Sequence, residues 1–136
     1  MVIKNDISYA ARLLPGDDLK KSIEKLVKNK EIQAGWIAGC VGSLTAYSIR
    51  FANQQKASAG NGYFEILNVN GTVSTSGLHL HITIADENGV TIGGHLMEGC
   101  KVYTTAEIIL VASPNYLFTR EKDGATGWKE LKVNER

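Results

Sequence analysis

The sequence lacks most of the features that mark membrane, secreted or disulfide-rich proteins. Its 136 residues include only two cysteines, two prolines and two tryptophans. No apolar run approaches the roughly 20 residues that a membrane-spanning helix needs, and residues 1–5 lack the apolar region of a signal peptide. Cys40 and Cys100 have neither the spacing of a metal motif nor the density of a disulfide scaffold. We therefore expect a cytoplasmic protein that does not contact the membrane, with both thiols reduced and in or near the core.

An excess of charge of either sign is also missing. The 15 Lys and Arg residues nearly balance the 14 Asp and Glu residues, which gives a formal net charge of +1. The whole chain thus has no electrostatic footprint for nucleic acid, although a local basic patch is compatible with this balance. No glycine-rich phosphate loop leads into a helix, and no G-x-S-x-G nucleophile motif is present. The length and the 43% hydrophobic composition predict one globular domain spanning residues 1–136.

One principal helix is predicted near the N-terminus. It begins at Asp17-Asp18, where acidic residues are favourable, and apolar residues at helical spacing continue the pattern towards Lys30. Its lysines indicate a solvated face more readily than a phosphate site. The other segments favour strands separated by Gly, Pro, Asn and Asp turns, so the pattern predicts an α+β fold. Strands are expected at 7–14, 32–44, 45–51, 62–73, 78–84, 102–111 and 116–120, with a polar loop at 52–61 and a frayed tail at 132–136.

All three histidines of the chain lie between residues 79 and 95. Side chains alternate between the two faces of a strand, so His79 and His81 project together from one face. The leucines and isoleucines that alternate with them in residues 78–84 project from the other face, which reads as a core face. The sequence therefore predicts two imidazoles side by side on the outer face of a strand.

The turn after this strand decides where the third histidine lies. A two-residue Asn88-Gly89 loop would place Ile82 opposite His95 and would mix apolar and polar residues on each face. A three-residue loop at 87–89, with the glycine in a bulge position, places His81 opposite His95 and keeps the two sets apart. Register normally follows the hydrophobic pattern, so we favour the second loop. Directly opposed residues have Cβ atoms about 4.5–5.5 Å apart, which is close enough for two imidazoles to share a metal.

Three neutral imidazoles suit a divalent metal and leave a fourth position open for water or substrate. Imidazole suits several transition metals, and the alternative is three histidines that bond locally or face water. A bound metal lowers the pKa of its water, and catalysis then needs an acid or base nearby. Glu107, Glu98 and Glu65 are candidates, and Arg120 is a candidate ion-pair partner of Glu107. A structural pair is the favoured role of Glu107, and the residues leave open whether the chain is an enzyme.

Short segments spread over nearly the whole chain carry a family resemblance. They are RLLPGDDL (12–19), AGCVGS (38–43), FEIL (64–67), GLHLHITIAD (77–86), GGHL (93–96), TAEI (105–108), REKD (120–123) and TGW (126–128). Together they resemble the plants and prokaryotes conserved (PPC) domain, a family whose members include PD1-like DNA-binding proteins.

The resemblance implies an α+β fold built on a mainly antiparallel, barrel-like sheet, and it implies a homotrimer. In prokaryotic members a histidine trio binds a metal, usually taken as zinc, and this trio corresponds to His79, His81 and His95. Plant members generally lack the histidines and carry separate AT-hook arms, whereas this chain has the histidines and no Arg-Gly-Arg-Pro arm. Tyr63 stands where the plant-type partner-binding segment has an arginine. The resemblance is therefore to the prokaryotic type.

Three functions remain open on the sequence alone. The favoured one is a trimeric metal-binding protein whose sites serve a small ligand or a metal-dependent reaction. The second is a PD1-like DNA-binding regulator, against which the near-neutral charge and the missing arm count. The third is a structural or partner-recruiting trimer module.

Overall fold

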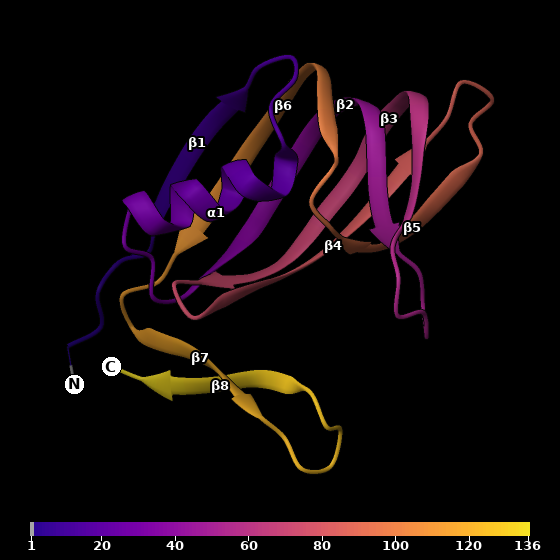
Figure 1. Cartoon of the computed structure of the whole chain (residues 1–136). Coiled ribbons are helices and arrows are strands. Elements are labelled where there is room, and N and C mark those ends of the chain that lie inside the picture. The colour runs from indigo at the N-terminus through magenta and orange to yellow at the C-terminus, as the bar shows by residue number, and fades with distance from the viewer. Residues whose placement is uncertain (1) are drawn as a thin grey trace.

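The computed structural model describes residues 2–136, which contain one helix and eight strands (Figure 1). The expected α+β class with a helix near the N-terminus is confirmed. Within these residues no helix has the length and apolarity needed to cross a membrane. The elements are β1 (Ile7–Leu13), α1 (Leu19–Asn29), β2 (Gly35–Arg50), β3 (Ser58–Ser74), β4 (Gly77–Ala85), β5 (Thr91–Leu96), β6 (Lys101–Ala112), β7 (Tyr116–Lys122) and β8 (Lys129–Glu135).

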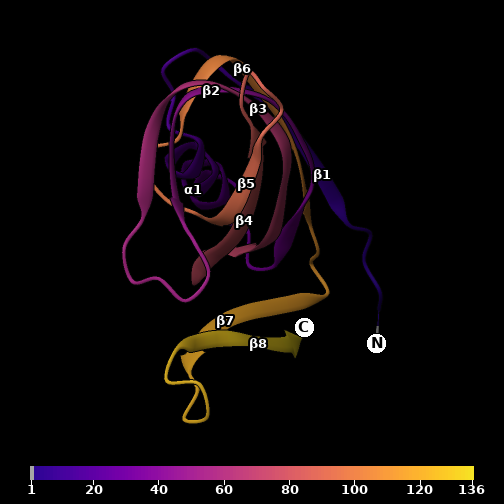
Figure 2. The same ribbon diagram turned by 90° about the vertical axis from the view of Figure 1, so that its right-hand side faces the viewer.

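Six strands form an antiparallel sheet in the order β1-β6-β2-β3-β4-β5. The last strand returns to the end of β2, where Ile49 pairs with Leu96 and Arg50 pairs with His95. This extra pairing closes β2 to β5 into a partial ring, and α1 lies inside the curve of the sheet (Figure 2). The expected mainly antiparallel, barrel-like sheet is therefore confirmed.

The helix α1 is fixed at its N-terminus by Asp18, which is buried. Its carboxylate accepts a hydrogen bond from the Lys21 N–H at 3.0 Å, a standard N-cap contact. The same carboxylate accepts from the Gly99 N–H at 2.8 Å and lies 3.7 Å from the Lys101 ammonium. One side chain thus caps the helix and attaches it to the turn between β5 and β6. The buried face of the helix consists of Leu19, Ile23 and Val27.

The core lies between α1 and the concave face of the sheet. Cys100 is fully buried in this core and Cys40 is half-buried beside it, and both thiols are free. Burial raises the pKa of each thiol to about 11. Both cysteines are therefore protected thiols in or near the core, as expected.

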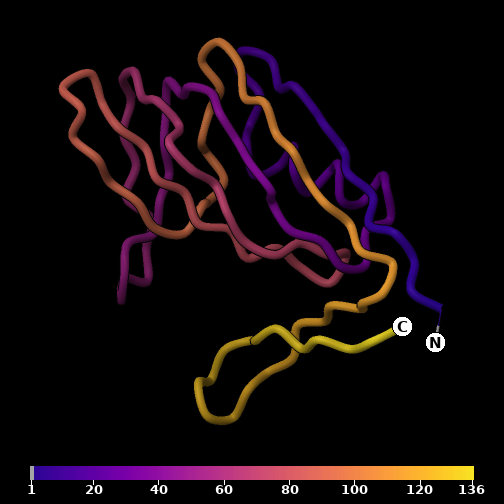
Figure 3. Tube along the Cα trace, turned by 180° about the vertical axis from the view of Figure 1, so that it is seen from behind, coloured from indigo at the N-terminus to yellow at the C-terminus, as the bar shows by residue number. Residues whose placement is uncertain are grey.

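Two predicted boundaries are wrong. The loop expected at 52–61 ends earlier, because β3 begins at Ser58 and pairs with Ile49 of β2. The tail expected to fray at 132–136 instead forms most of β8, which pairs with β7 from Tyr116–Glu135 to Lys122–Lys129. The β7–β8 hairpin lies apart from the six-stranded sheet, beside its lower edge (Figure 3). Neither segment alternates clearly between apolar and polar residues, so sequence periodicity did not reveal these strands.

Candidate metal centre

The β4–β5 hairpin has the register that the hydrophobic pattern favours. His81 pairs with His95, and Ile84 pairs with Ile92. The loop contains three residues, 87–89, because the Asp86 N–H donates to the Val90 carbonyl at 2.9 Å. Gly89 has a φ of 77°, a left-handed conformation that suits glycine in the bulge position. The predicted three-residue loop is confirmed, and the two-residue alternative is excluded.

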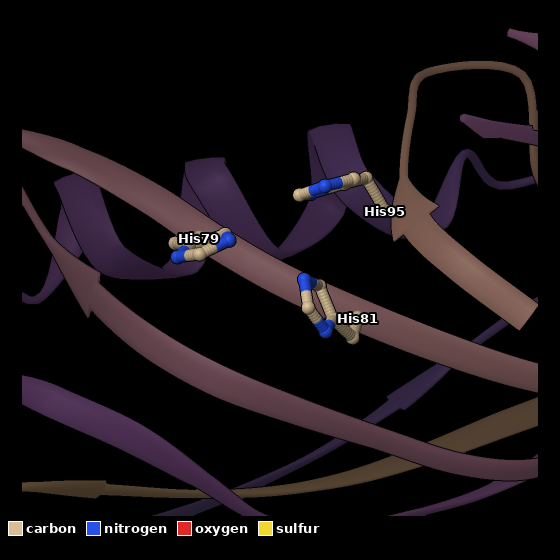
Figure 4. Close-up of side chains that lie close together, drawn as sticks. All are labelled: His79, His81 and His95. Carbon is tan, nitrogen blue, oxygen red and sulfur yellow. The ribbon is translucent and has the colours of Figure 1, made fainter. Parts of the chain in front are cut away.

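The hairpin brings the three histidines together on its outer face. Leu80, Ile82 and Ile84 are at most 4% exposed, so the alternating positions of β4 face outwards. The ring centroid of His81 lies 4.6 Å from that of His95 and 5.0 Å from that of His79, and the His79 and His95 centroids are 5.5 Å apart. Figure 4 shows the rings converging from the two strands.

The three side chains fit a divalent transition metal. Each offers one imidazole nitrogen, and these nitrogens all lie within 4.8 Å of one another. Tetrahedral zinc with Zn–N bonds of about 2.0–2.1 Å places its ligand nitrogens about 3.4 Å apart. The present limit of 4.8 Å exceeds this spacing, so the rings would have to approach one another on binding the metal. The donor set is also chemically suitable, since imidazole is a common zinc ligand.

Glycines let the neighbouring strands approach the histidines. At Gly94 an added Cβ would lie 2.6 Å from the Arg50 carbonyl oxygen, so only glycine lets β5 pair this closely with β2 beside His95. At Gly71, whose φ is 139°, an added Cβ would overlap the carbonyl oxygen of His79. Both ends of the cluster therefore depend on close backbone contacts between strands.

Burial and nearby charges favour the neutral form of two histidines. Burial lowers the pKa of His79 below 6.5, and the positive charges of His81, Arg120 and Arg50 lower it further, against a smaller opposing effect of Glu130. Burial likewise lowers the pKa of His95, helped chiefly by Arg50. A metal ligand must be an unprotonated imidazole. The surroundings of the cluster thus favour the ligating form at neutral pH.

A cleft of about 720 Å³ adjoins the cluster and includes His79 and His95 in its wall. It lies near the end of the β4–β5 pairing. These two strands pair from Ala85–Thr91 to His81–His95, and at His95 and Leu96 β5 also pairs with β2. Two arginines also line this cleft. Arg50 donates to the Gln54 carbonyl at 2.9 Å, and Arg120 donates to the Thr72 hydroxyl at 2.7 Å.

None of the predicted acid–base candidates lines this cleft, whereas Arg120, the predicted partner of Glu107, does. Glu107 is exposed on β6 opposite Val41, three strands away from β4, which corresponds to about 14 Å. Glu65 pairs with Ala85, four residues and about 13 Å along β4 from His81. The expected Glu107–Arg120 ion pair is not formed, and Arg120 instead donates to Thr72 on β3.

Glu98, the remaining acid–base candidate, is exposed. Its carboxylate lies 3.9 Å from the ammonium of Lys21 and does not line the cleft of the histidines. Sequence reasoning missed Arg50, because only the β2–β5 pairing places it beside His95. Its position at the end of an apolar strand gave no signal of that contact.

Comparisons with known proteins extend the resemblance over most of the chain. The family model of the Plants and Prokaryotes Conserved (PCC) domain, the PPC domain of the sequence resemblance, matches residues 4–114. Two Synechococcus proteins named "Bifunctional protein GlmU" are 46% and 43% identical over 125 and 127 residues, which are 92% and 93% of this chain. The chain spans only 20% of the length of each of these relatives.

Solved structures share the fold. A hypothetical protein from Salmonella enterica is 39% identical, with a TM-score of 0.95 over 97% of this chain and 96% of that one. The metal-containing protein AF0104 from Archaeoglobus fulgidus is 24% identical, with a TM-score of 0.79 over 96% and 95% of the two chains. A Bacteroides thetaiotaomicron protein that carries the provisional name of a DNA-binding protein is 22% identical, with a TM-score of 0.81 over 92% and 91%.

Proposed function

This chain belongs to the Plants and Prokaryotes Conserved (PCC) domain family, and we propose that it is a metal-binding protein whose site is formed by His79, His81 and His95. The observation that carries the proposal is the convergence of three imidazole nitrogens within 4.8 Å on one exposed face. A structural neighbour from Archaeoglobus fulgidus is named as a metal-containing protein. Zinc is the metal we expect, because three histidines with an open position are a standard zinc ligand set.

The site is suited to a small ligand or a metal-dependent reaction. When bound, the metal supplies a Lewis acid and a water of lowered pKa. The chain itself supplies three imidazole ligands and the adjoining cleft of about 720 Å³, a volume typical of small-molecule sites. Of the non-histidine candidates named from the sequence, Arg120 lines this cleft, whereas Glu65, Glu98 and Glu107 do not. We therefore assign Arg120 to ligand orientation and give Glu65 and Glu107 no part in the site.

Metal analysis tests this proposal directly. Protein purified without a histidine tag is compared with His81→Ala and with Asn70→Ala, a change of the exposed residue that pairs with His81 on β3. We expect about one metal ion per chain in the wild type and in Asn70→Ala, and almost none in His81→Ala, because removing one of three ligands leaves too few for tight binding. Equal, near-zero metal in all three proteins would contradict the proposal.

We also propose that the chain forms a homotrimer through the outer face of β2, β3 and β6. Four large apolar side chains are exposed there: Val41, Tyr63, Tyr103 and Ile109 are between 42% and 58% exposed. The rings of Tyr63 and Tyr103 lie 5.0 Å apart, so the patch is continuous between β3 and β6. Exposed apolar side chains gathered on one face favour a protein interface, and Glu107, opposite Val41, is a charged residue on the same face. We place the protein in the cytoplasm, where its two free thiols stay reduced.

DNA binding is the second candidate, because structural neighbours carry provisional names as DNA-binding proteins. Cationic side chains in the cleft of the histidines are the local feature that favours it. A salt titration distinguishes the two candidates, since phosphate contacts strengthen as the salt concentration falls. We expect no DNA affinity at low ionic strength, and a steep salt dependence would favour the second candidate.

A further inference from the structure

We propose that the cleft beside the histidine cluster binds a small oxyanion, a carboxylate or phosphate group held between Arg50 and Arg120. One oxygen of the same ligand would occupy the open position of the metal. This inference rests on the metal site proposed above and adds to it the chemical class of the ligand.

The charge of the cleft is the first support. Its wall includes four cationic side chains, Lys20, Arg50, Arg120 and Lys129, and one carboxylate, that of Glu130. The whole chain is almost balanced, with a formal net charge of +1. Positive charge is therefore concentrated in this cleft, and a bound divalent metal would increase it. Concave surfaces lined by one sign of charge attract ligands of the opposite sign.

The positions of the two guanidinium groups are the second support. Arg50 pairs with His95 across β2 and β5. Arg120 donates to Thr72, and Thr72 pairs with His79 across β3 and β4. Each arginine thus stands next to a different histidine of the cluster. Both arginines line the same cleft as these two histidines.

Both guanidiniums also keep donors free. Within residues 2–136 neither forms an ion pair with a carboxylate, and each has a single hydrogen-bond acceptor, the Gln54 carbonyl for Arg50 and the Thr72 hydroxyl for Arg120. A guanidinium has five N–H donors in a planar fork that matches a carboxylate or phosphate. The existing bonds hold each arginine in place and leave the other donors available for an anion.

The shape of the cleft favours a small molecule over a polymer. Its volume of about 720 Å³ falls in the range of small-ligand pockets. The exposed Trp128 lies in its wall and offers an apolar surface to the remainder of a ligand. A small molecule with its anionic group between the arginines and its remaining atoms against Trp128 would fit inside this cleft. A DNA backbone would not fit inside it in this way.

Calorimetric titration of the zinc-loaded protein tests the inference. The probes are inorganic phosphate and lactate, and lactamide is the neutral control with the shape of lactate. We expect phosphate or lactate to bind and lactamide not to bind, and the preferred probe distinguishes a phosphate ligand from a carboxylate ligand. Arg50→Gln and Arg120→Gln should each weaken anion binding at least about tenfold, because each removes charged hydrogen-bond donors.

The matched control is Arg12→Gln. Arg12 is an exposed arginine on β1 that bonds to Thr105 and Thr104, and it does not line the cleft. This variant should bind the anion as the wild type does. If either cleft variant fails to fold, Lys129→Gln takes its place. Lys129 is exposed, and its loss should weaken anion binding about threefold.

Zinc content, measured on the same samples, separates the two proposals. Two outcomes would overturn this inference and leave the metal site standing. In the first, the protein retains zinc but binds neither anion. In the second, it binds an anion but the cleft variants do not weaken that binding. Wild-type protein that takes up no zinc would overturn the metal site, and this inference with it. Weaker anion binding in the cleft variants with full zinc content supports both.

Discussion

Besides burial, side chains from other strands lower the pKa of two histidines of the cluster. His79 is influenced by Arg120 from β7, and His95 is influenced by Arg50 from β2. These cations stand beside residues that must be neutral to bind a metal. They therefore reduce the competition between protons and the metal, and they also attract an anionic ligand. In the proposed site the same arginines would serve both purposes without being metal ligands.

A pH prediction follows from the lowered pKa values. In metal-free protein, His79 and His95 should titrate below 6.5, as measured by NMR, and Arg50→Gln should raise the pKa of His95 by removing a nearby positive charge. Below about pH 6.5 the unfolded chain binds more protons at these residues than the folded chain does. The free energy of unfolding should therefore fall as the pH falls from 6.5 towards the folded pKa values.

Metal binding should weaken in the same direction of pH change as stability. The metal should remain bound near pH 6.5 and dissociate as the pH falls further and the ligands become protonated. Equilibrium dialysis across this range measures the retained metal. Retention that is unchanged at pH 4 would show that the ligands are not these histidines.

At the scale of elements, the sequence was most informative where apolar and polar residues alternate strictly. The alternation in β4, together with Gly89, was sufficient to predict the hairpin, its loop and the pairing of His81 with His95. Helical spacing of apolar residues likewise predicted α1. Neither β8 nor the beginning of β3 has such a pattern, because their residues are mostly polar and exposed. Their pairing is set by a partner strand, which local periodicity does not report.

The close contact between β3 and β4 gives a prediction about Gly71. Gly71→Ala should destabilise the protein by about 2–4 kcal/mol, because the new Cβ would overlap the His79 carbonyl and because a φ of 139° is unfavourable for alanine. It should also weaken metal binding, since β4 must shift at His79. Urea unfolding and metal titration measure the two effects.

Gly124→Ala is the matched control for this change. Gly124 lies in the turn between β7 and β8, where an added Cβ has no atom within 4 Å. This variant should change stability by no more than about 0.5 kcal/mol and should leave metal binding unaltered. Similar losses of stability in both variants would show that the contact at His79 is not the cause.

At the scale of the whole molecule, ring closure determines which residues share a site. The three histidines are close in sequence and on one hairpin, so they were predictable. Arg50 joins them only through the β2–β5 pairing, and Arg120 only through the placement of the β7–β8 hairpin. Glu107 is a lone charge in an apolar segment, for which the sequence favoured a structural ion pair with Arg120 over a catalytic role. It instead lies on the outer face of the sheet, opposite the exposed Val41.

That outer face gives the last prediction, which concerns assembly. Val41→Glu should convert the proposed trimer into monomers, because it places a second negative charge opposite Glu107 on the face that would become buried between copies. Val133→Glu is the matched control, since Val133 is 54% exposed on β8, close to the 58% of Val41, but lies outside the patch. Sedimentation velocity measures the mass of each. A wild type that sediments as a monomer, or a Val41→Glu variant that remains a trimer, would contradict this interface.

The histidine cluster lies on another part of the ring, so Val41→Glu monomers should still bind metal if each chain supplies a complete set of ligands. Loss of metal on dissociation would show instead that a neighbouring copy completes the site.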